Sequence, residues 1–310
     1  MELETFEPRR LMSVSLNANT GVLTANGSTG SDVITVKVES GVMKVSVKNE
    51  NKPTRYHNFA AHKVKQLVVN GHAGGDQILL MPSVKVPSVL NTGAGGTTQD
   101  VVQGGSGNDV ININAYGASV NGKSGNDTMV AFKGKAEIYG DLGNDTYVDK
   151  ADTARTNFYG GQGTDTVDFS GHTKGLLMRS SGTYSNHSGF YSPGSNSLEV
   201  TAANRFTFFG VDNFIGGQGD DHIYGSEIGN VLKGNGGKDR LYGLGGNDQL
   251  YGGSGNDSLY GGSGNDSLYG QLGDDKLSAY DHVKDVLDGG AGTDEATYDK
   301  GLDNVSGVSS

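Results

Sequence analysis

Hydrophobic and polar residues alternate in short stretches along the chain, and in its last third they follow a period of nine residues. Seven copies of the unit run without a gap from residue 216 to residue 278, as in "GGSGNDSLY" at 252–260. The eighth position of every copy is apolar: Ile223, Leu232, Leu241, Leu250, Leu259, Leu268 and Leu277. Because side chains alternate across a strand, this residue would point inward and its neighbours outward. The glycine-rich remainder predicts a turn. The pattern therefore predicts an all-β chain, and it predicts no helix.

A carboxylate recurs at the sixth position of the same unit. The positions are Asp221, Asp239, Asp248, Asp257, Asp266 and Asp275, with Asn230 in the second copy. After a ten-residue degenerate copy, "AYDHVKDVLD", the unit appears once more as "GGAGTDEAT" with Asp294. Internal repeats of this kind indicate a solenoid, in which each unit stacks on its neighbours.

An earlier block follows the same pattern at twice the spacing. Asp109, Asp127 and Asp145 lie eighteen residues apart, and Asp165 follows after twenty. Two nonapeptides would therefore form one full coil. Isolated copies upstream contain Asp32, Asp76 and Asp100, and none of these has another repeat aspartate eighteen residues away. We expect these three to be solvated turn residues.

The units "GGQGDDHIY", "GLGGNDQLY" and "GGSGNDSLY" resemble the G-G-x-G-x-D-x-U-x nonapeptides of repeats-in-toxin (RTX) proteins, also called hemolysin-type calcium-binding repeats. The resemblance covers residues 216–297 almost completely, residues 104–168 at every second unit, and the first hundred residues thinly. It implies a parallel β-roll, a form of β-helix solenoid, in which six-residue loops bind Ca²⁺ and three-residue strands stack.

The residues themselves support a cation. Two apolar side chains per coil form only a thin core, and stacking would bring like-charged aspartates into register. Calcium accepts six to eight oxygen ligands from carboxylates and backbone carbonyls, which glycine-rich turns expose. The alternative is that the aspartates only cap Asx-turns in water. The candidate calcium ligands are Asp109, Asp127, Asp145, Asp165, Asp221, Asp239, Asp248, Asp257, Asp266, Asp275 and Asp294, with Gly217, Gly219, Gly237, Gly246, Gly253, Gly255, Gly262, Gly264 and Gly273.

The eighteen-residue coil predicts which aspartates are neighbours. One ladder would contain Asp221, Asp239, Asp257 and Asp275, and a second ladder Asn230, Asp248 and Asp266. The early block would form a third ladder from Asp109 to Asp165. Asn230 offers a neutral ligand, so its site should be the weakest of its ladder.

Composition and charge narrow the classes of function. The chain has 52 glycines among 310 residues and only 34% hydrophobic residues, which leaves little material for a globular enzyme core. Residues 216–310 carry 16 acidic and 6 basic residues, a net charge of −10, which disfavours nucleic acid and anionic membranes as partners. There is no cysteine, which is compatible with export, and there is no apolar run long enough for a transmembrane helix.

The same reasoning divides the chain into six segments. Residues 1–14 are an export-related segment, because residues 6–12 resemble the short "LEPR-x-L-L" segment at the start of many exported bacterial proteins; a polar terminus is the alternative. Residues 15–92 form a β-rich N-terminal cap with three strands that extends the stack, and residues 93–169 form the first repeat block. Residues 170–215 are a β-hairpin insertion, residues 216–298 the second repeat block, and residues 299–310 a tail.

The sequence predicts a secreted, calcium-binding β-roll protein with a structural or adhesive role at the cell surface and calcium-dependent folding. The alternatives are a carbohydrate-active enzyme of the lyase or epimerase type, or the detached C-terminal part of an RTX hydrolase or toxin. We predict no enzyme activity, since neither an H-E-x-x-H nor a suitably placed G-x-S-x-G motif is present. Tyrosines at the ninth position could bind a cell-surface glycan or protein, or could stack on one another: Tyr224, Tyr242, Tyr251, Tyr260 and Tyr269.

Overall fold

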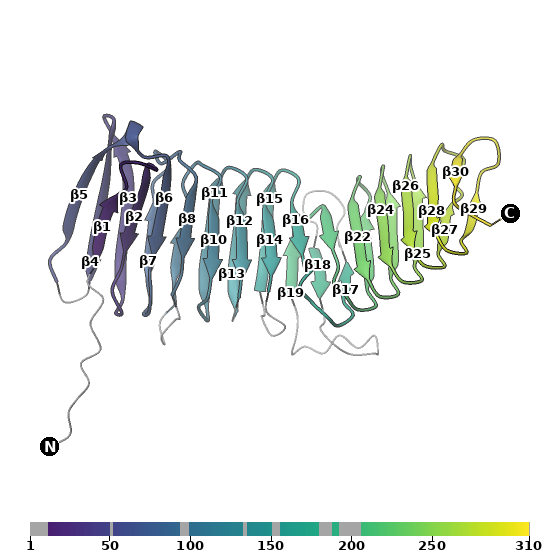
Figure 1. The fold of residues 1–310 in the computed structure, drawn as a ribbon, viewed down its shortest axis with the longest axis horizontal. Helices are drawn as coiled ribbons and strands as arrows, with labels where there is room; N and C mark the ends of the chain where they lie inside the picture. Colours follow the sequence, from purple (N-terminus) through teal and green to yellow (C-terminus); the bar gives the residue numbers. More distant parts are fainter. Residues whose placement is uncertain are drawn as a thin grey trace, which may run out of the picture. The chain divides into compact units, whose positions relative to one another are not determined.

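The computed structural model describes residues 12–49, 52–93, 99–132, 135–150, 156–179, 188–191 and 206–309. These residues are almost entirely strand, and their only helical segment is the short 3₁₀ turn Ala61–Lys63. The chain divides into two compact units, Met1–Asp145 and Thr146–Ser310 (Figure 1). The export-related segment predicted at the N-terminus lies almost wholly outside the described residues.

Unit 1 consists of two rows of strands that face each other across a narrow core. One row contains, in order, β1 (Ser13–Leu16), β2 (Val22–Asn26), β6 (Gln66–Asn70), β8 (Ser88–Asn91), β10 (Val110–Ile113) and β12 (Thr128–Ala131). The other contains β5 (Arg55–Ala60), β4 (Val42–Asn49), β3 (Asp32–Glu39), β7 (Gln77–Leu80), β9 (Val101–Gln103), β11 (Ala118–Ser124) and β13 (Ala136–Leu142). In the first row, neighbouring strands from β2 to β12 pair in parallel. In the second row, neighbouring strands from β3 through β7 to β13 also pair in parallel.

The N-terminal end of unit 1 departs from the predicted stack. The three predicted strands exist as β3, β4 and β6, but β3, β4 and β5 form an antiparallel meander instead of successive coils. Strand β1 also pairs antiparallel with β2. The strongly alternating segment 32–49 is too long for a coil of short strands, and it folds back on itself at Ser40 and Gly41, which both have positive φ.

Unit 2 continues with the same parallel construction. One row contains β14 (Thr146–Asp149), β16 (Thr166–Asp168), β20 (Asn213–Ile215), β22 (Val231–Gly236), β24 (Gln249–Ser254), β26 (Ser267–Leu272), β28 (Val286–Ala291) and β30 (Asn304–Ser306). A second contains β17 (Leu177–Arg179), β21 (His222–Ser226), β23 (Arg240–Gly245), β25 (Ser258–Ser263), β27 (Lys276–Ala279) and β29 (Glu295–Tyr298).

A third group of strands in unit 2 contains β15 (Thr156–Gln162), β19 (Phe206–Phe209) and β18 (Ser188–Tyr191). Of these, β18 and β19 lie in residues 170–215, where a β-hairpin insertion was predicted, and β15 lies in the first repeat block. Strand β18 pairs antiparallel with β19, whereas β19 pairs parallel with β15. Residues 192–205, which join β18 to β19, lie outside the described residues.

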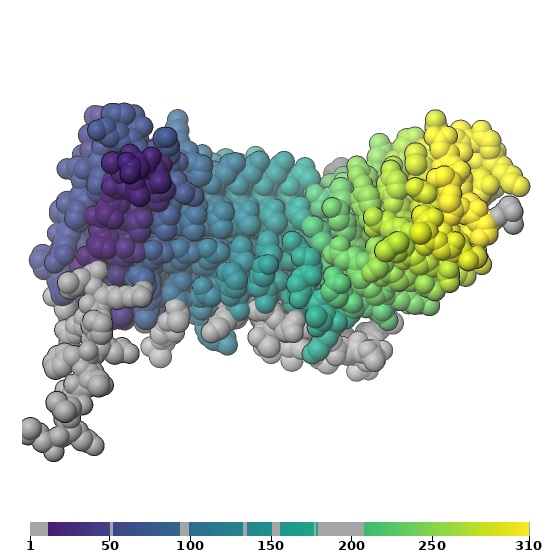
Figure 2. All heavy atoms as spheres, in the orientation of Figure 1, coloured from purple at the N-terminus to yellow at the C-terminus, as the bar shows by residue number. Residues whose placement is uncertain are grey.

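The register of unit 2 confirms the eighteen-residue coil. Leu250 pairs with Leu232 and Leu268, and Leu259 pairs with Leu241 and Leu277. These leucines are 0–2% exposed, so they form the two inward stacks that the sequence predicted. Side chains of successive strands lie in regular rows on the surface of each unit (Figure 2). The fold is a parallel β-solenoid of the β-roll type.

The core near the start of unit 2 is aromatic, in contrast to the predicted leucine stacks. Tyr147, Phe158, Phe169, Phe208 and Phe214 are all fully buried. The rings of Tyr147 and Phe158 stack with centroids 5.6 Å apart, and Phe208 meets Phe214 edge-on at 6.3 Å. Larger side chains fill the coils that carry the hairpin insertion, which the leucine period did not reveal.

Candidate metal centre

The aspartates of unit 2 lie in the predicted ladder order, and a backbone hydrogen bond joins each one, or rung, to the next. In the first ladder of unit 2, the backbone N–H of Asp221 donates to Oδ1 of Asp239 at 2.7 Å. Asp239 donates in the same way to Asp257, Asp257 to Asp275, and Asp275 to Asp294, each at 2.8 Å. The turns between strands thus place one carboxylate of every coil beneath that of the preceding coil.

The second ladder of unit 2 begins with Asn230. Asn230 donates to Asp248 at 2.7 Å, Asp248 to Asp266 at 2.9 Å, and Asp266 to Asp285 at 2.7 Å. Sequence analysis missed Asp285, because the degenerate copy has ten residues and shifts the aspartate by one position. The ladder register itself agrees with the prediction.

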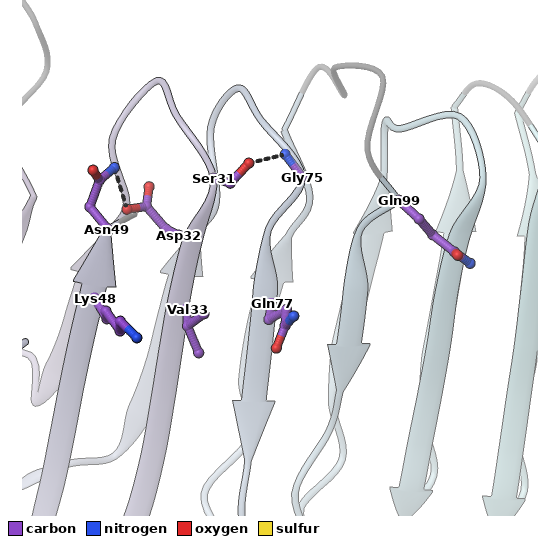
Figure 3. A pocket seen from close by; sticks show the side chains of 8 residues that line it. All are labelled: Ser31, Asp32, Val33, Lys48, Asn49, Gly75, Gln77 and Gln99. Carbon is purple, nitrogen blue, oxygen red and sulfur yellow. Dashed lines mark hydrogen bonds between the residues drawn. The ribbon is translucent and has the colours of Figure 1, made fainter. Parts of the chain in front are cut away.

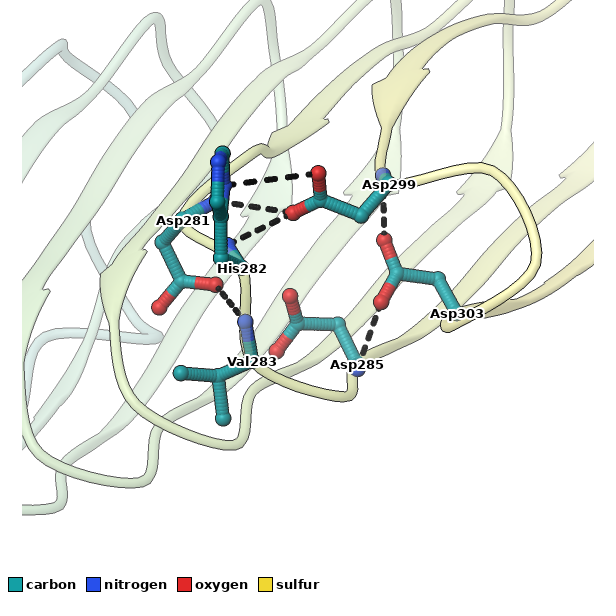
Figure 4. A network of polar contacts seen from close by, with 6 residues as sticks. All are labelled: Asp281, His282, Val283, Asp285, Asp299 and Asp303. Atoms are coloured by element: carbon teal, nitrogen blue, oxygen red, sulfur yellow. Dashed lines mark hydrogen bonds and ion pairs between the residues drawn. The ribbon is translucent and has the colours of Figure 1, made fainter.

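The second ladder ends in a group of acidic residues at the C-terminal end of unit 2 (Figure 4). Asp285 donates its N–H to Asp303 Oδ1 at 3.0 Å, and Asp303 Oδ2 accepts the N–H of Asp299 at 2.7 Å. Asp299 Oδ2 accepts the N–H groups of Asp281 and His282 at 3.1 and 2.7 Å. Backbone N–H groups therefore bind the carboxylates that end this ladder.

Unit 1 contains two ladders, of which one was not predicted. Asp109 donates to Asp127, and Asp127 to Asp145, both at 2.8 Å. On the other side, Asp32 donates to Asp76 at 2.9 Å and Asp76 to Asp100 at 2.8 Å. Asp165 lies in unit 2, where its N–H donates to Asp212 Oδ2 at 2.7 Å.

The expectation that Asp32, Asp76 and Asp100 are solvated turn residues is wrong. They are 1%, 1% and 0% exposed. Their spacings of 44 and 24 residues conceal the ladder because the β4–β5 excursion lies between Asp32 and Asp76. Each of the three is the sixth residue of its nonapeptide and lies two residues before an apolar one, and this was the available signal.

The ladder aspartates are buried, and in most of them one carboxylate oxygen contacts neither water nor a hydrogen-bond donor. All the predicted aspartates are at most 2% exposed. Within the described part of the chain, the Oδ2 atoms with no hydrogen-bond partner include those of Asp76, Asp100, Asp127, Asp239, Asp248, Asp257, Asp266, Asp275, Asp285 and Asp294. A buried carboxylate oxygen without a partner is costly, so it requires a proton or a cation.

Glycine leaves the space around each of these oxygens. A β-carbon at the first position of the loop, as at Gly234 or Gly252, would collide with the Oδ2 atom of Asp239 or Asp257. Seven of the predicted glycines adopt positive φ, with values from 95 to 135: Gly237, Gly246, Gly253, Gly255, Gly262, Gly264 and Gly273. Gly217 and Gly219 instead lie against His172 and Lys174.

Burial dominates the electrostatics of the ladders. Desolvation raises the pKa of Asp127 and of Asp239 to about 8, against an opposing hydrogen bond from the backbone of the preceding rung. It raises the pKa of Asp248 to about 7, and that of Asp257 and Asp266 to about 6. Neighbouring ladder carboxylates raise the pKa values further. The ladder carboxyls thus hold a proton more tightly than exposed aspartates do, and a bound cation would supply positive charge in its place.

The fifth position of the repeat forms a further ladder that sequence analysis missed. The N–H groups of Asn126 and Asn144 donate to Oδ1 of Asn108 and Asn126 at 2.9 and 3.0 Å. Asn265 donates likewise to Asn247, and Asp274 to Asn256, each at 3.0 Å. The recurring Asn before the aspartate was the signal. These exposed side chains hold adjacent loops together.

The donor set fits a hard, oxygen-binding cation. The described residues contain no cluster of three or more His, Asp or Glu side chains that could hold a metal by themselves. Backbone carbonyls would therefore have to complete a site, and calcium accepts such mixed ligands in flexible geometry. The residues that would hold calcium are the ladder aspartates and the loop glycines, and the ion would neutralise the stacked carboxylates.

The tyrosine rows stack on one another. Tyr242 lies 4.6 Å from Tyr224 and 4.8 Å from Tyr260 between ring centroids, with interplanar angles of 7° and 4°. Tyr251 and Tyr269 stack at 5.1 Å, and Lys233 lies over Tyr251. Most ring faces are therefore covered by neighbouring tyrosines, which favours the stacking interpretation over glycan binding.

Unit 1 contains a groove of about 400 Å³ lined by Ser31, Asp32, Val33, Lys48, Asn49, Gly75, Gln77 and Gln99 (Figure 3). Among its described lining residues Lys48 is the only basic side chain, and Asn49 is already bonded to Ser28 and Asp32. The described lining contains one acidic side chain, Asp32, and no arginine.

Comparison with known families agrees with this geometry. The class of protein is a β-solenoid built from nonapeptide coils with buried aspartate ladders. A family model for RTX calcium-binding nonapeptide repeats matches residues 91–112, 116–147, 206–227, 228–259 and 251–280. The chain therefore contains RTX calcium-binding nonapeptide repeats, and such repeats bind several calcium ions. A search of curated proteins finds no match. None of the described helical segments is long and apolar enough to cross a membrane.

Proposed function

We propose that the protein is exported and that its repeat coils fold when they bind calcium outside the cell, where the rigid β-roll has a structural or adhesive role at the surface. The observation that carries this proposal is the set of buried, unpartnered Oδ2 atoms in every described ladder. Calcium would satisfy these atoms, whereas in its absence the coils would bury them at a cost.

The higher calcium concentration outside the cell would trigger folding. Calcium modules outside the cell have dissociation constants of about 10⁻⁴–10⁻³ M, far above the free calcium concentration of the cytosol. The chain would then remain unfolded in its repeat blocks before export. The stacked fold that forms afterwards has regular rows of side chains and shielded tyrosines, which suits a scaffold rather than a catalyst.

Circular dichroism and calorimetry of the full chain test the proposal. At about pH 8, where the ladder carboxylates lose their protons, we expect the far-UV spectrum of the metal-free protein to lack most of its strand signal. The signal should return on addition of CaCl₂ at about 10⁻³ M. Calorimetry should report several ions bound with the heat of folding. An unchanged spectrum in chelator and calcium would exclude calcium-dependent folding.

A further inference from the structure

The first rungs of two ladders, Asp109 in unit 1 and Asp221 in unit 2, differ from the rungs that follow them. Asp109 accepts two backbone hydrogen bonds, one at Oδ1 from Ser88 N–H at 2.9 Å and one at Oδ2 from Gly105 N–H at 2.8 Å. Asp221 does the same, at Oδ1 from Leu176 N–H at 2.7 Å and at Oδ2 from Gly217 N–H at 2.6 Å. Both oxygens of each leading carboxylate are therefore bonded by the protein.

The donors come from two segments that have the same local structure without sharing a sequence motif. We define them as the clasps, residues 81–88 in unit 1 and residues 169–176 in unit 2. Each clasp begins with a tight turn, closed by Val84 N–H to Met81 O at 2.9 Å in one and by His172 N–H to Phe169 O at 2.8 Å in the other.

Each clasp then binds the first loop of its block at two points, four residues apart. The carbonyls of Val84 and His172 accept N–H groups from the third loop position, Ser106 and Gln218, both at 2.7 Å. Four residues later, Ser88 and Leu176 donate to the leading aspartates. The same bonds thus recur at the same spacing in both units.

The ladder that begins with Asn230 also has a leading rung satisfied by the protein. Asn230 Nδ2 donates to the carbonyl of Asp212 at 2.6 Å, and its Oδ1 accepts the N–H of Ser226 at 2.7 Å. Asp32, which leads the remaining ladder, accepts the N–H and hydroxyl of Ser28 at 2.6 and 2.9 Å. In contrast, Asp127 and Asp239, the next rungs after the clasped ones, have unpartnered Oδ2 atoms.

We propose that the two clasps close the loops of Asp109 and Asp221 without calcium, and that these two aspartates are therefore not required as calcium ligands. The clasped loop is then a preformed edge onto which calcium-loaded coils add. This inference rests on the proposed calcium-dependent folding. It assigns the calcium requirement for folding to the rungs that follow the leading one.

Hydrogen exchange of the full chain, with and without calcium, tests the clasps directly. In metal-free protein we expect the amides of Gly217 and Gln218 to exchange at least about tenfold more slowly than those of Gly253 and Ser254, which occupy the matching loop positions of an interior copy. Calcium should protect both loops. Loss of protection at both loops together would overturn the inference. Protection of both without calcium would instead overturn the proposed calcium-dependent folding.

A pair of matched substitutions tests the assignment of ligands. Asp221→Asn and Asp239→Asn remove the same charge from adjacent, fully buried rungs. We expect calorimetry to count fewer calcium ions in Asp239→Asn than in the wild type, and an unchanged number in Asp221→Asn. An equal loss in both variants would show that the leading aspartate is a ligand. If Asp221→Asn does not fold, the wild-type hydrogen exchange decides.

Discussion

In Asn230 an amide nitrogen replaces one carboxylate oxygen of the ladder aspartates, and this changes which partner the side chain needs. It occupies the position that is aspartate in the other copies of the second repeat block, and its amide nitrogen lies 2.6 Å from the carbonyl oxygen of Asp212. A neutral side chain that both donates and accepts can satisfy this buried position alone. The sequence predicted a weaker calcium ligand here, and the contacts show that protein groups bind both the nitrogen and the oxygen of the Asn230 amide.

Asn230→Asp should convert this rung into a calcium-dependent one. The new carboxylate oxygen would face the Asp212 carbonyl, and the two acceptors would repel each other unless a cation lies between them. At a CaCl₂ concentration just sufficient to fold the wild type, we expect the variant to be about 1–3 kcal/mol less stable. Further CaCl₂ should raise the melting temperature of the variant by more than it raises that of the wild type.

Asn247→Asp is the matched control for this prediction. Asn247 lies at the exposed fifth position of the same block and accepts the N–H of Asn265 at 3.0 Å. An aspartate can accept this hydrogen bond equally well, so its response to calcium should match that of the wild type. Equal responses of the two variants would contradict the role assigned to the Asn230 amide.

At the scale of the loop, close backbone approach determines where glycine is needed. Gly255 has φ of 126, and a β-carbon there would overlap the carbonyl of Gly237 in the preceding coil. Gly301 has φ of 87, but a β-carbon there would meet no atom within 4 Å. Substitutions at these two glycines therefore distinguish the free-energy cost of a positive φ from the cost of pushing adjacent coils apart.

Gly255→Ala should therefore destabilise the protein far more than Gly301→Ala. Both alanines must adopt a left-handed conformation, at about 1 kcal/mol each. Only the first forces adjacent coils apart, which should add about 1–3 kcal/mol. Urea denaturation in saturating calcium measures both. Equal destabilisation would show that the coils can shift to accommodate the methyl group.

The sequence predicted those elements that repeat. The apolar eighth position predicted the leucine stacks, and the aspartate spacing predicted the ladder register. Both predictions hold because residues eighteen positions apart lie side by side in adjacent coils. The clasps were not predictable, since residues 81–88 and 169–176 act through backbone groups that carry no side-chain signature. The Asp32–Asp76–Asp100 ladder was hidden by the inserted β4–β5 strands, and Asp285 by a single extra residue.

At the scale of the whole molecule, charge links folding to both protons and calcium. Residues 216–310 carry a net charge of −10, and their ladder carboxylates are buried. Screening by salt weakens repulsion between exposed charges but reaches buried groups much less. A proton or a bound cation must therefore neutralise the ladders in both units.

The metal-free protein should consequently become less stable as the pH rises. In the folded state burial raises the pKa of Asp127 and Asp239 to about 8, and that of Asp76, Asp221 and Asp248 to about 7. An unfolded aspartate titrates near 3.9, so the folded state binds more protons above that pH. The stabilisation is complete below about pH 4 and is lost as the pH passes through these folded values.

Thermal melts of protein freed of metal by dialysis, at about pH 5 and about pH 8, measure this linkage. We expect the higher melting temperature at the lower pH, and we expect CaCl₂ to restore stability at the higher pH by replacing the lost protons. Sodium chloride at equal ionic strength is the control, because it screens exposed charges without binding the buried carboxylates. A metal-free melting temperature that is equal or higher at pH 8 would mean that water or another donor satisfies the ladder oxygens, so that the buried carboxylates are not what makes the fold depend on calcium.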